Sequence, residues 1–100
     1  MDQRKQSRTV RVDNRAGLHA RAALLIAKLA REHEVALAVV KDSQAAEASN
    51  MIQVLSLGAR QGDELVLEAS GPRAEEALDA LERLFAERFH EEDEDGKSPG

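Results

Sequence analysis

The chain has 100 residues, a formal net charge of −5 and 42% hydrophobic residues, which suits one domain with a small core. It has no cysteine, tryptophan or tyrosine, so disulfides and thiolate chemistry are excluded, and an acidic chain without these rings argues against nucleic acid as a partner. No apolar run approaches the roughly 20 residues of a membrane span, and no apolar N-terminal segment resembles an export signal. We therefore expect a cytoplasmic protein of one domain that does not insert into a membrane.

The N-terminal third predicts a strand followed by a helix. Residues 1–7 are polar and are expected to be flexible. Residues 8–13 alternate in hydrophobicity with a period of two, which indicates a strand. A glycine-containing loop then leads into a helix over about 19–32, because apolar residues recur at helical spacing: Ala22, Leu25, Ile26 and Leu29.

The middle of the chain predicts two strands and a short helix. Residues 35–40 are almost continuously apolar and indicate a buried strand. After a polar turn, 45–49 predict a short returning strand. Asn50 is a good helix cap, and the apolar run 51–57 predicts a helix that ends at Gly58.

The C-terminal third predicts one more strand and one more helix. Residues 64–69 indicate a strand, and its alternating glutamates predict that one face of the sheet is solvated. Pro72 suits the first position of a final helix, which an apolar stripe extends to about residue 89. Residues 91–100 form an acidic tail that we expect to be disordered.

The predicted order β-α-β-β-α-β-α indicates the fold class. Four short strands with one solvated face need cover on the other face, and three amphipathic helices can provide it. We therefore predict an α+β open-faced sandwich, in which three helices cover one face of a four-stranded antiparallel sheet. This domain would span 8–90, between a flexible N-terminus (1–7) and a disordered tail (91–100).

Common catalytic and ligand-binding signatures are missing from the sequence. No Gly-x-Ser-x-Gly elbow supports a serine hydrolase, and neither a dinucleotide-binding nor a P-loop glycine pattern occurs. His19, His33 and His90 are widely separated and do not have the spacing of a metal site. We therefore predict neither a metal nor a cofactor.

His19 is the one candidate for chemistry, because it lies near the first turn of the predicted helix. Unpaired N–H groups and the positive end of the helix dipole favour an anion there. A neutral imidazole is a competent nucleophile toward phosphorus, Arg21 could neutralise a phosphoryl dianion, and Gly17 allows a close backbone approach. A histidine that only caps the helix or lies at the surface remains the alternative.

Three blocks of the sequence resemble one family. The stretch 17–23, Gly-Leu-His-Ala-Arg-Ala-Ala, looks like the active-site signature of HPr, the histidine phosphocarriers of the bacterial phosphotransferase system. The block 48–59 resembles the regulatory-site helix of that family, and 62–78 resembles its last strand and helix. The resemblance covers about residues 8–90, and the family fold agrees with the predicted order.

The resemblance implies a function and a set of site residues. His19 would accept a phosphoryl group on Nδ1 from phosphorylated enzyme I and pass it to an EIIA-type protein, as a carrier and not as a stand-alone catalyst. Arg21, the backbone N–H of Ala20 and Gly17 would stabilise the phosphoryl group. The carrier would be a monomer.

The resemblance also implies a docking face of exposed apolar residues on the first two helices. Its predicted members are Leu18, Ala20, Met51, Ile52 and Leu55. The alternative for each is ordinary core, which we favour for Leu55. Met51 and Ile52 are favoured for the surface, because adjacent residues on a short helix cannot both face inward.

The sequence departs from the family pattern at three positions. Ala22 replaces the usual proline, and Ala16 replaces a residue whose side chain could contact the phosphoryl group. The regulatory serine of some relatives falls at Asn50, which cannot be phosphorylated, although Ser49 is its neighbour. Parts of the chain look more like the nitrogen-related branch (NPr), so an alternative function is a regulator whose His19 phosphorylation controls the binding of partner proteins.

Overall fold

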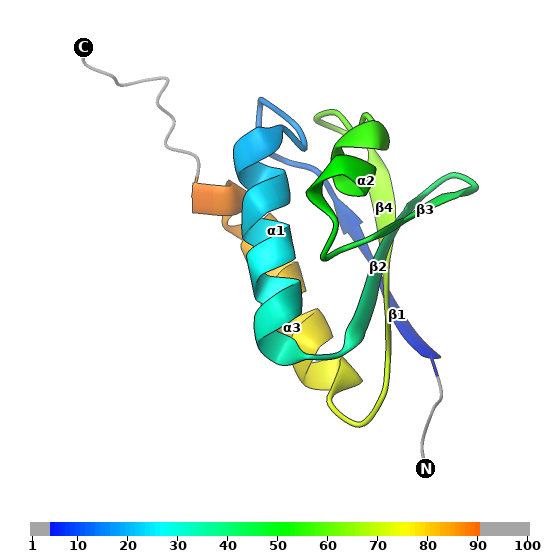
Figure 1. Ribbon diagram of the computed structural model, residues 1–100. Helices are drawn as coiled ribbons and strands as arrows, with labels where there is room; N and C mark the ends of the chain where they lie inside the picture. The colour runs from blue at the N-terminus through cyan, green and yellow to red at the C-terminus, as the bar shows by residue number, and fades with distance from the viewer. Residues whose placement is uncertain (1–4, 91–100) are drawn as a thin grey trace.

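The computed structural model describes residues 5–90, and its elements follow the predicted order (Figure 1). The predicted acidic tail, 91–100, lies outside the described residues. None of the helices within 5–90 is long and apolar enough to cross a membrane. The elements are β1 (Lys5–Arg11), α1 (Ala20–His33), β2 (Ala36–Lys41), β3 (Gln44–Glu47), α2 (Met51–Ser56), β4 (Glu64–Ser70), α3 (Ala74–Ala86) and a 3₁₀ turn, η1 (Arg88–His90).

The four strands form one antiparallel sheet in the order β1-β4-β2-β3. Alternate residues of β4 are buried, namely Leu65, Leu67 and Ala69, whereas Glu64 is exposed and Glu68 half-buried. Figure 1 shows α1 and α3 on the same side of the sheet, and α2 packs against α1 and β3. The predicted α+β open-faced sandwich, with its solvated sheet face, is therefore confirmed.

The core between the sheet and the helices is built from aliphatic side chains and alanine. Among its fully buried members are Ile26 of α1, Leu67 of β4 and Leu81 of α3. Burial of each such side chain contributes about 1.5–3 kcal/mol to folding. The two aromatic rings of the chain, Phe85 and Phe89, meet edge to face with their centroids 4.8 Å apart.

The first strand begins earlier than predicted, at Lys5. Lys5, Gln6 and Ser7, predicted to be flexible, belong to β1 and pair with the end of β4. The polar side chains of these residues gave no hydrophobic alternation from which a strand could be predicted. They can be polar because β1 is an edge strand whose outward positions face solvent. The backbone pairing that orders them leaves no hydrophobic pattern in the sequence.

The final helix also begins later than predicted. Pro72 does not occupy the first helical position, because the chain turns at Gly71 (φ +115°) and the helix begins at Ala74. The Ala74 N–H donates to the Gly71 carbonyl at 3.1 Å, which closes this turn. At the other end α3 stops at Ala86, and the left-handed turn η1 carries Phe89 back into the core.

Candidate functional site

The loop between β1 and α1 is fixed by backbone bonds on both sides. Within it, the Gly17 N–H donates to the Asn14 carbonyl at 3.1 Å. Across it, the Leu18 N–H donates to the carbonyl of Ala59, in the segment that precedes β4, also at 3.1 Å. The loop is thereby anchored to a neighbouring loop before the helix begins.

Gly17 occupies a position that excludes a side chain. Its φ is +70°, and a Cβ there would lie 2.7 Å from the Ala59 carbonyl oxygen. Both the left-handed backbone and the close approach therefore require glycine. The close approach that glycine allows here is to the backbone of Ala59, and the predicted role of Gly17 toward a phosphoryl group stays a prediction.

His19 is the N-cap of α1, with extended backbone angles (φ −90°, ψ −174°). Its Nδ1 accepts a hydrogen bond from the Arg21 N–H at 3.2 Å, and its carbonyl accepts one from Ala23 at 2.9 Å. Because Nδ1 accepts, a neutral ring carries its proton on Nε2 and keeps the Nδ1 lone pair. The Nε2 atom is buried and has no partner within residues 5–90.

The first turn of α1 offers donors around this nitrogen. Backbone N–H groups of the first three helical residues have no intrahelical acceptor, and the helix dipole adds partial positive charge. Ala20 and Arg21 are both exposed. Within residues 5–90 the Arg21 guanidinium makes no ion pair, so it is available to an incoming anion. The structure thus brings together His19, Arg21 and the helix N-terminus.

The predicted docking residues divide into exposed and buried ones. Ile52 is 70% exposed and Ala20 is exposed, whereas Met51 and Leu55 are partly buried and pack against the core. Leu55, for which we favour the core, and Met51, for which we favour the surface, are thus both intermediate in burial. Leu18 is wrong as a docking residue because it is 5% exposed and belongs to the core.

Leu24, which the sequence reasoning missed, is an exposed apolar residue on the same helix. It is 50% exposed, although most leucines of the chain are buried. The available signal was its spacing, since it follows Ala20 by four residues and lies outside the buried stripe of α1. Together Ala20, Leu24 and Ile52 supply exposed apolar surface on two helices that contact each other.

The predicted regulatory position has a structural role. Asn50 caps α2, because its Oδ1 accepts the Gln53 N–H at 3.1 Å. Ser49 is exposed, and its carbonyl accepts a hydrogen bond from Arg31 of α1 at 3.3 Å. The predicted cap of α2 is therefore confirmed. Ser49, unlike Asn50, is an exposed residue with a hydroxyl group.

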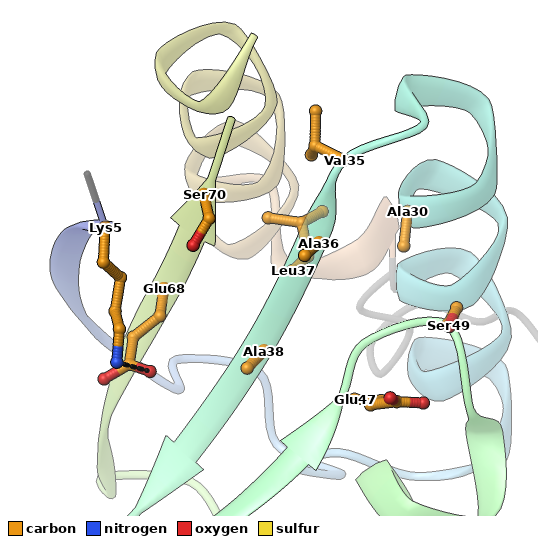
Figure 2. Close-up of a pocket in the computed structure, with 10 residues that line it drawn as sticks. All are labelled: Lys5, Ala30, Val35, Ala36, Leu37, Ala38, Glu47, Ser49, Glu68 and Ser70. Atoms are coloured by element: carbon orange, nitrogen blue, oxygen red, sulfur yellow. Dashed lines mark ion pairs between the residues drawn. The ribbon is translucent and has the colours of Figure 1, made fainter. Parts of the chain in front are cut away.

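The pocket in Figure 2 lies away from His19. It is lined by residues of β2 and β4 together with Ser49 and the end of α1, and the ion pair of Lys5 and Glu68 (3.5 Å) crosses one side of it. Within residues 5–90 no three histidine, aspartate or glutamate side chains are grouped to hold a metal ion. The described pocket therefore adds nothing to the chemistry of His19.

The chain matches known proteins in both sequence and fold. The family model PTS-HPr, the PTS HPr component phosphorylation site, matches residues 6–87. The chain is 42% identical to phosphocarrier protein HPr of Treponema pallidum, over 85% of this chain and 97% of that protein. It is 35% identical to phosphocarrier protein NPr of Escherichia coli K12, over 84% and 94%.

Solved structures agree with the sequence relatives. HPr-C-His from Thermoanaerobacter tengcongensis superposes with a TM-score of 0.82 at 36% identity, covering 87% of this chain and 98% of that one. HPr from Bacillus anthracis gives 0.75 at 29% identity, covering 79% and 94%. The chain belongs to the HPr family of phosphocarrier proteins of the phosphotransferase system.

Proposed function

We propose that this protein is a cytoplasmic, monomeric phosphocarrier that accepts a phosphoryl group from phosphorylated enzyme I and passes it to an EIIA-type protein. The accepting atom is Nδ1 of His19. One observation carries the proposal: Nδ1 receives the Arg21 N–H at the N-terminus of α1, so its lone pair lies where an anion is stabilised. Family membership supports the same reading.

The transfer forms one bond and breaks another. The Nδ1 lone pair forms a bond to phosphorus while the bond between phosphorus and the donor breaks, and the donor keeps the electrons of that bond. The proton on Nε2 stays on the ring, which becomes an imidazolium bearing the phosphoryl group. The backbone N–H groups of Ala20 and Arg21 and the Arg21 guanidinium then supply donors to the phosphoryl oxygens. Transfer to the acceptor reverses these steps.

The partner proteins would dock on exposed apolar residues of α1 and α2, two helices that contact each other. Ala20, next to His19 in the chain, is exposed, as are Leu24 and Ile52, and Met51 contributes the part of its side chain that is not packed on the core. Exposed arginines at the same helix end suit partners with an acidic rim. Since the protein supplies the accepting nitrogen and its surroundings only, each turnover needs both partners, and the carrier alone is not an enzyme.

The proposal is tested by phosphorylation in a defined mixture. The protein is incubated with enzyme I and labelled phosphoenolpyruvate, with His19→Ala as the variant and His33→Ala as the matched histidine control. We expect an acid-labile, base-stable label in the wild type and in His33→Ala and none in His19→Ala. Absence of label in the wild type would refute the phosphocarrier function.

A regulatory function is the second candidate, and the exposed Ala20 next to His19 favours it. A phosphoryl dianion on His19, beside Ala20, would weaken an apolar contact of this helix end with a bound protein. The two functions separate when EIIA-type proteins are added to the labelled carrier. Label that moves to an EIIA protein supports relay, whereas label that stays on His19 and changes the affinity for a partner supports regulation.

Some relatives have a regulatory serine at the position of Asn50. Control of this protein by serine phosphorylation would have to use a different residue. Asn50 has no hydroxyl, and its side chain is occupied as the cap of α2. Ser49 is the neighbouring candidate, because it is exposed. A label from a serine kinase that disappears in Ser49→Ala would support this site.

A further inference from the structure

Asn14 is the single polar residue within 5–90 that the fold buries, with 1% of its surface exposed. Its Nδ2 donates to the Gly17 carbonyl at 2.7 Å, and its Oδ1 is buried without a partner in the described chain. An asparagine with an unused buried acceptor is costly, and an apolar side chain would fill the space at lower cost. The asparagine at this position is therefore explained by its hydrogen bond to Gly17 and not by packing alone.

The orientation of the Asn14 amide is determined by chemistry. If its oxygen and nitrogen were exchanged, Oδ1 would face the Gly17 carbonyl oxygen, and two acceptors would repel each other. Nδ2 must therefore face Gly17, which leaves Oδ1 on the other side of the amide group. Asn14 thus supplies one donor that is used and one acceptor that is not.

The Gly17 carbonyl connects Asn14 to His19. It accepts Nδ2 of Asn14 at 2.7 Å and the backbone N–H of His19 at 3.0 Å. Asn14 holds Gly17 a second time, because its own carbonyl accepts the Gly17 N–H at 3.1 Å. The backbone of His19 is therefore bonded to Gly17, and Asn14 binds that residue at both its N–H and its carbonyl.

The position of the His19 ring depends on that attachment. Its Nδ1 meets the Arg21 N–H at 3.2 Å, which is at the long end of the hydrogen-bond range, so a small shift of the His19 backbone breaks the contact. A misplacement of about 1 Å can slow a reaction by large factors. The residue that fixes Gly17 consequently controls where the nucleophilic nitrogen lies.

We propose that Asn14 is a positioning residue for phosphoryl transfer, holding the Gly17 carbonyl and through it the backbone of His19 so that Nδ1 faces the N-terminus of α1. This inference rests on the proposed function of His19. Within residues 5–90, Oδ1 of Asn14 and Nε2 of His19 are both buried without a hydrogen-bond partner.

The test removes the hydrogen bond while keeping the size of the side chain. Asn14→Leu keeps the number and branching of the side-chain heavy atoms and has no donor, and Asn14→Asp has similar shape with an acceptor in place of Nδ2. Because the Arg21 amide donates to Nδ1, its NMR resonance reports the position of the ring. We expect both variants to move the Arg21 amide and the His19 Nδ1 resonances toward those of an unstructured peptide, and phosphorylation by enzyme I to slow about tenfold.

Val39→Ala is the matched control for lost stability. Val39 is fully buried in β2 and pairs with Leu67 and Ala46, remote from the loop. It should destabilise the fold but leave the Arg21 resonance and the rate per folded molecule unchanged. Asn14 variants that behave like this control would overturn the positioning role.

Failure of the proposed function and failure of a variant to fold can each be distinguished from failure of the positioning role. If the wild type accepts no phosphoryl group, the proposed function fails, whereas the Arg21 and His19 resonances still decide whether Asn14 positions the ring. Amide spectra establish that each variant is folded. If Asn14→Leu and Asn14→Asp do not fold, the smaller change Asn14→Ala is compared with Val39→Ala on the same resonances, and equal spectra at the site overturn the inference.

Discussion

The backbone N–H of Arg21 donates to Nδ1 of His19 at 3.2 Å, so the nitrogen proposed to accept the phosphoryl group is also the cap of α1. The two uses compete for one lone pair. When the N–P bond forms, the Arg21 N–H loses its acceptor on the ring and a phosphoryl oxygen becomes the nearest replacement. The helix is therefore capped in both states, by the ring before transfer and by the phosphoryl group afterwards.

Removal of this cap should lower stability independently of transfer. His19→Ala leaves the Arg21 N–H without its side-chain acceptor and should cost about 1 kcal/mol in the free energy of unfolding, measured by urea titration. His19→Asn restores a preferred capping side chain and should be at least as stable as the wild type. Neither variant should carry label. If His19→Ala unfolds at the wild-type urea concentration, the Nδ1 bond contributes nothing to the helix.

Arg21 should affect transfer and not folding. Its side chain is exposed and makes no ion pair within residues 5–90, so Arg21→Ala should leave the urea midpoint unchanged. A lost charge-assisted bond to a phosphoryl dianion corresponds to about a tenfold slower transfer, and Arg21→Lys should recover part of it. Arg31→Ala, on the same helix, is the control. Equal transfer rates in all variants would remove Arg21 from the site.

Much of this fold could be predicted because its periodicities are clean. Alternation in 8–13 and helical spacing in 19–32 reflect burial against one core, and the structure places β1 and α1 there within a few residues. The start of β1 at Lys5 could not be predicted, because pairing of an edge strand uses backbone groups that leave no side-chain pattern. The turn before α3 was misplaced, since Pro72 suits a turn as well as a first helical position.

The candidate site was partly visible in the sequence. His19, Arg21 and Gly17 lie within five residues, and the capping geometry joins them as local spacing suggests. The burial of Leu18 depends on the tertiary fold, because its N–H bonds to Ala59, more than 40 positions away, and its side chain joins the core. The bonds of Asn14 to Gly17 are local, but the burial of Asn14 is set by the tertiary fold, and its residue type does not signal it.

Gly17 and Gly58 have similar φ angles, so alanine substitutions at the two positions distinguish the cost of a left-handed backbone from the cost of a steric clash. Gly17 (φ +70°) would place a Cβ 2.7 Å from the Ala59 carbonyl oxygen, whereas a Cβ on Gly58 (φ +63°) meets nothing within 4 Å. Gly58→Ala should therefore cost only the left-handed strain, about 1 kcal/mol, and Gly17→Ala about 3 kcal/mol or more. Urea titration measures both. Equal costs would show that the loop relaxes and that the close approach is not restrictive.

An ion-pair group joins the edge strand to the last helix. Nη1 of Arg8 lies 2.8 Å from Asp79 and 2.7 Å from Glu82, and these bonds, that to Asp79 first, raise the pKa of Arg8 above its ordinary value. A raised pKa on a cation means that this stability is present at all pH values below the unfolded pKa, so the guanidinium adds no pH dependence near neutrality.

Because both carboxylates are well exposed, the Arg8 group should contribute little. Arg8→Ala should lower the free energy of unfolding by less than about 1 kcal/mol, and Arg8→Lys by less still. The measurement is urea titration in low and in molar salt, where screening should shrink the difference. A loss of several kcal/mol that salt does not reduce would mean that the aliphatic part of Arg8, and not its charge, holds β1 to α3.

Ala22 provides the last prediction, because it is the position where family members usually carry proline. It is the third residue of α1 and fully buried, and the first intrahelical bond runs from Ala23 to His19, so the Ala22 N–H has no backbone acceptor within 5–90. Proline removes that donor and restricts the unfolded chain, so Ala22→Pro should raise the free energy of unfolding by about 0.4–1 kcal/mol. Ala27→Pro, inside the same helix, should lower it by about 3 kcal/mol. Urea titration of both variants checks the contrast, and a destabilised Ala22→Pro would show that the Ala22 N–H is bonded or that the first turn departs from the proline geometry.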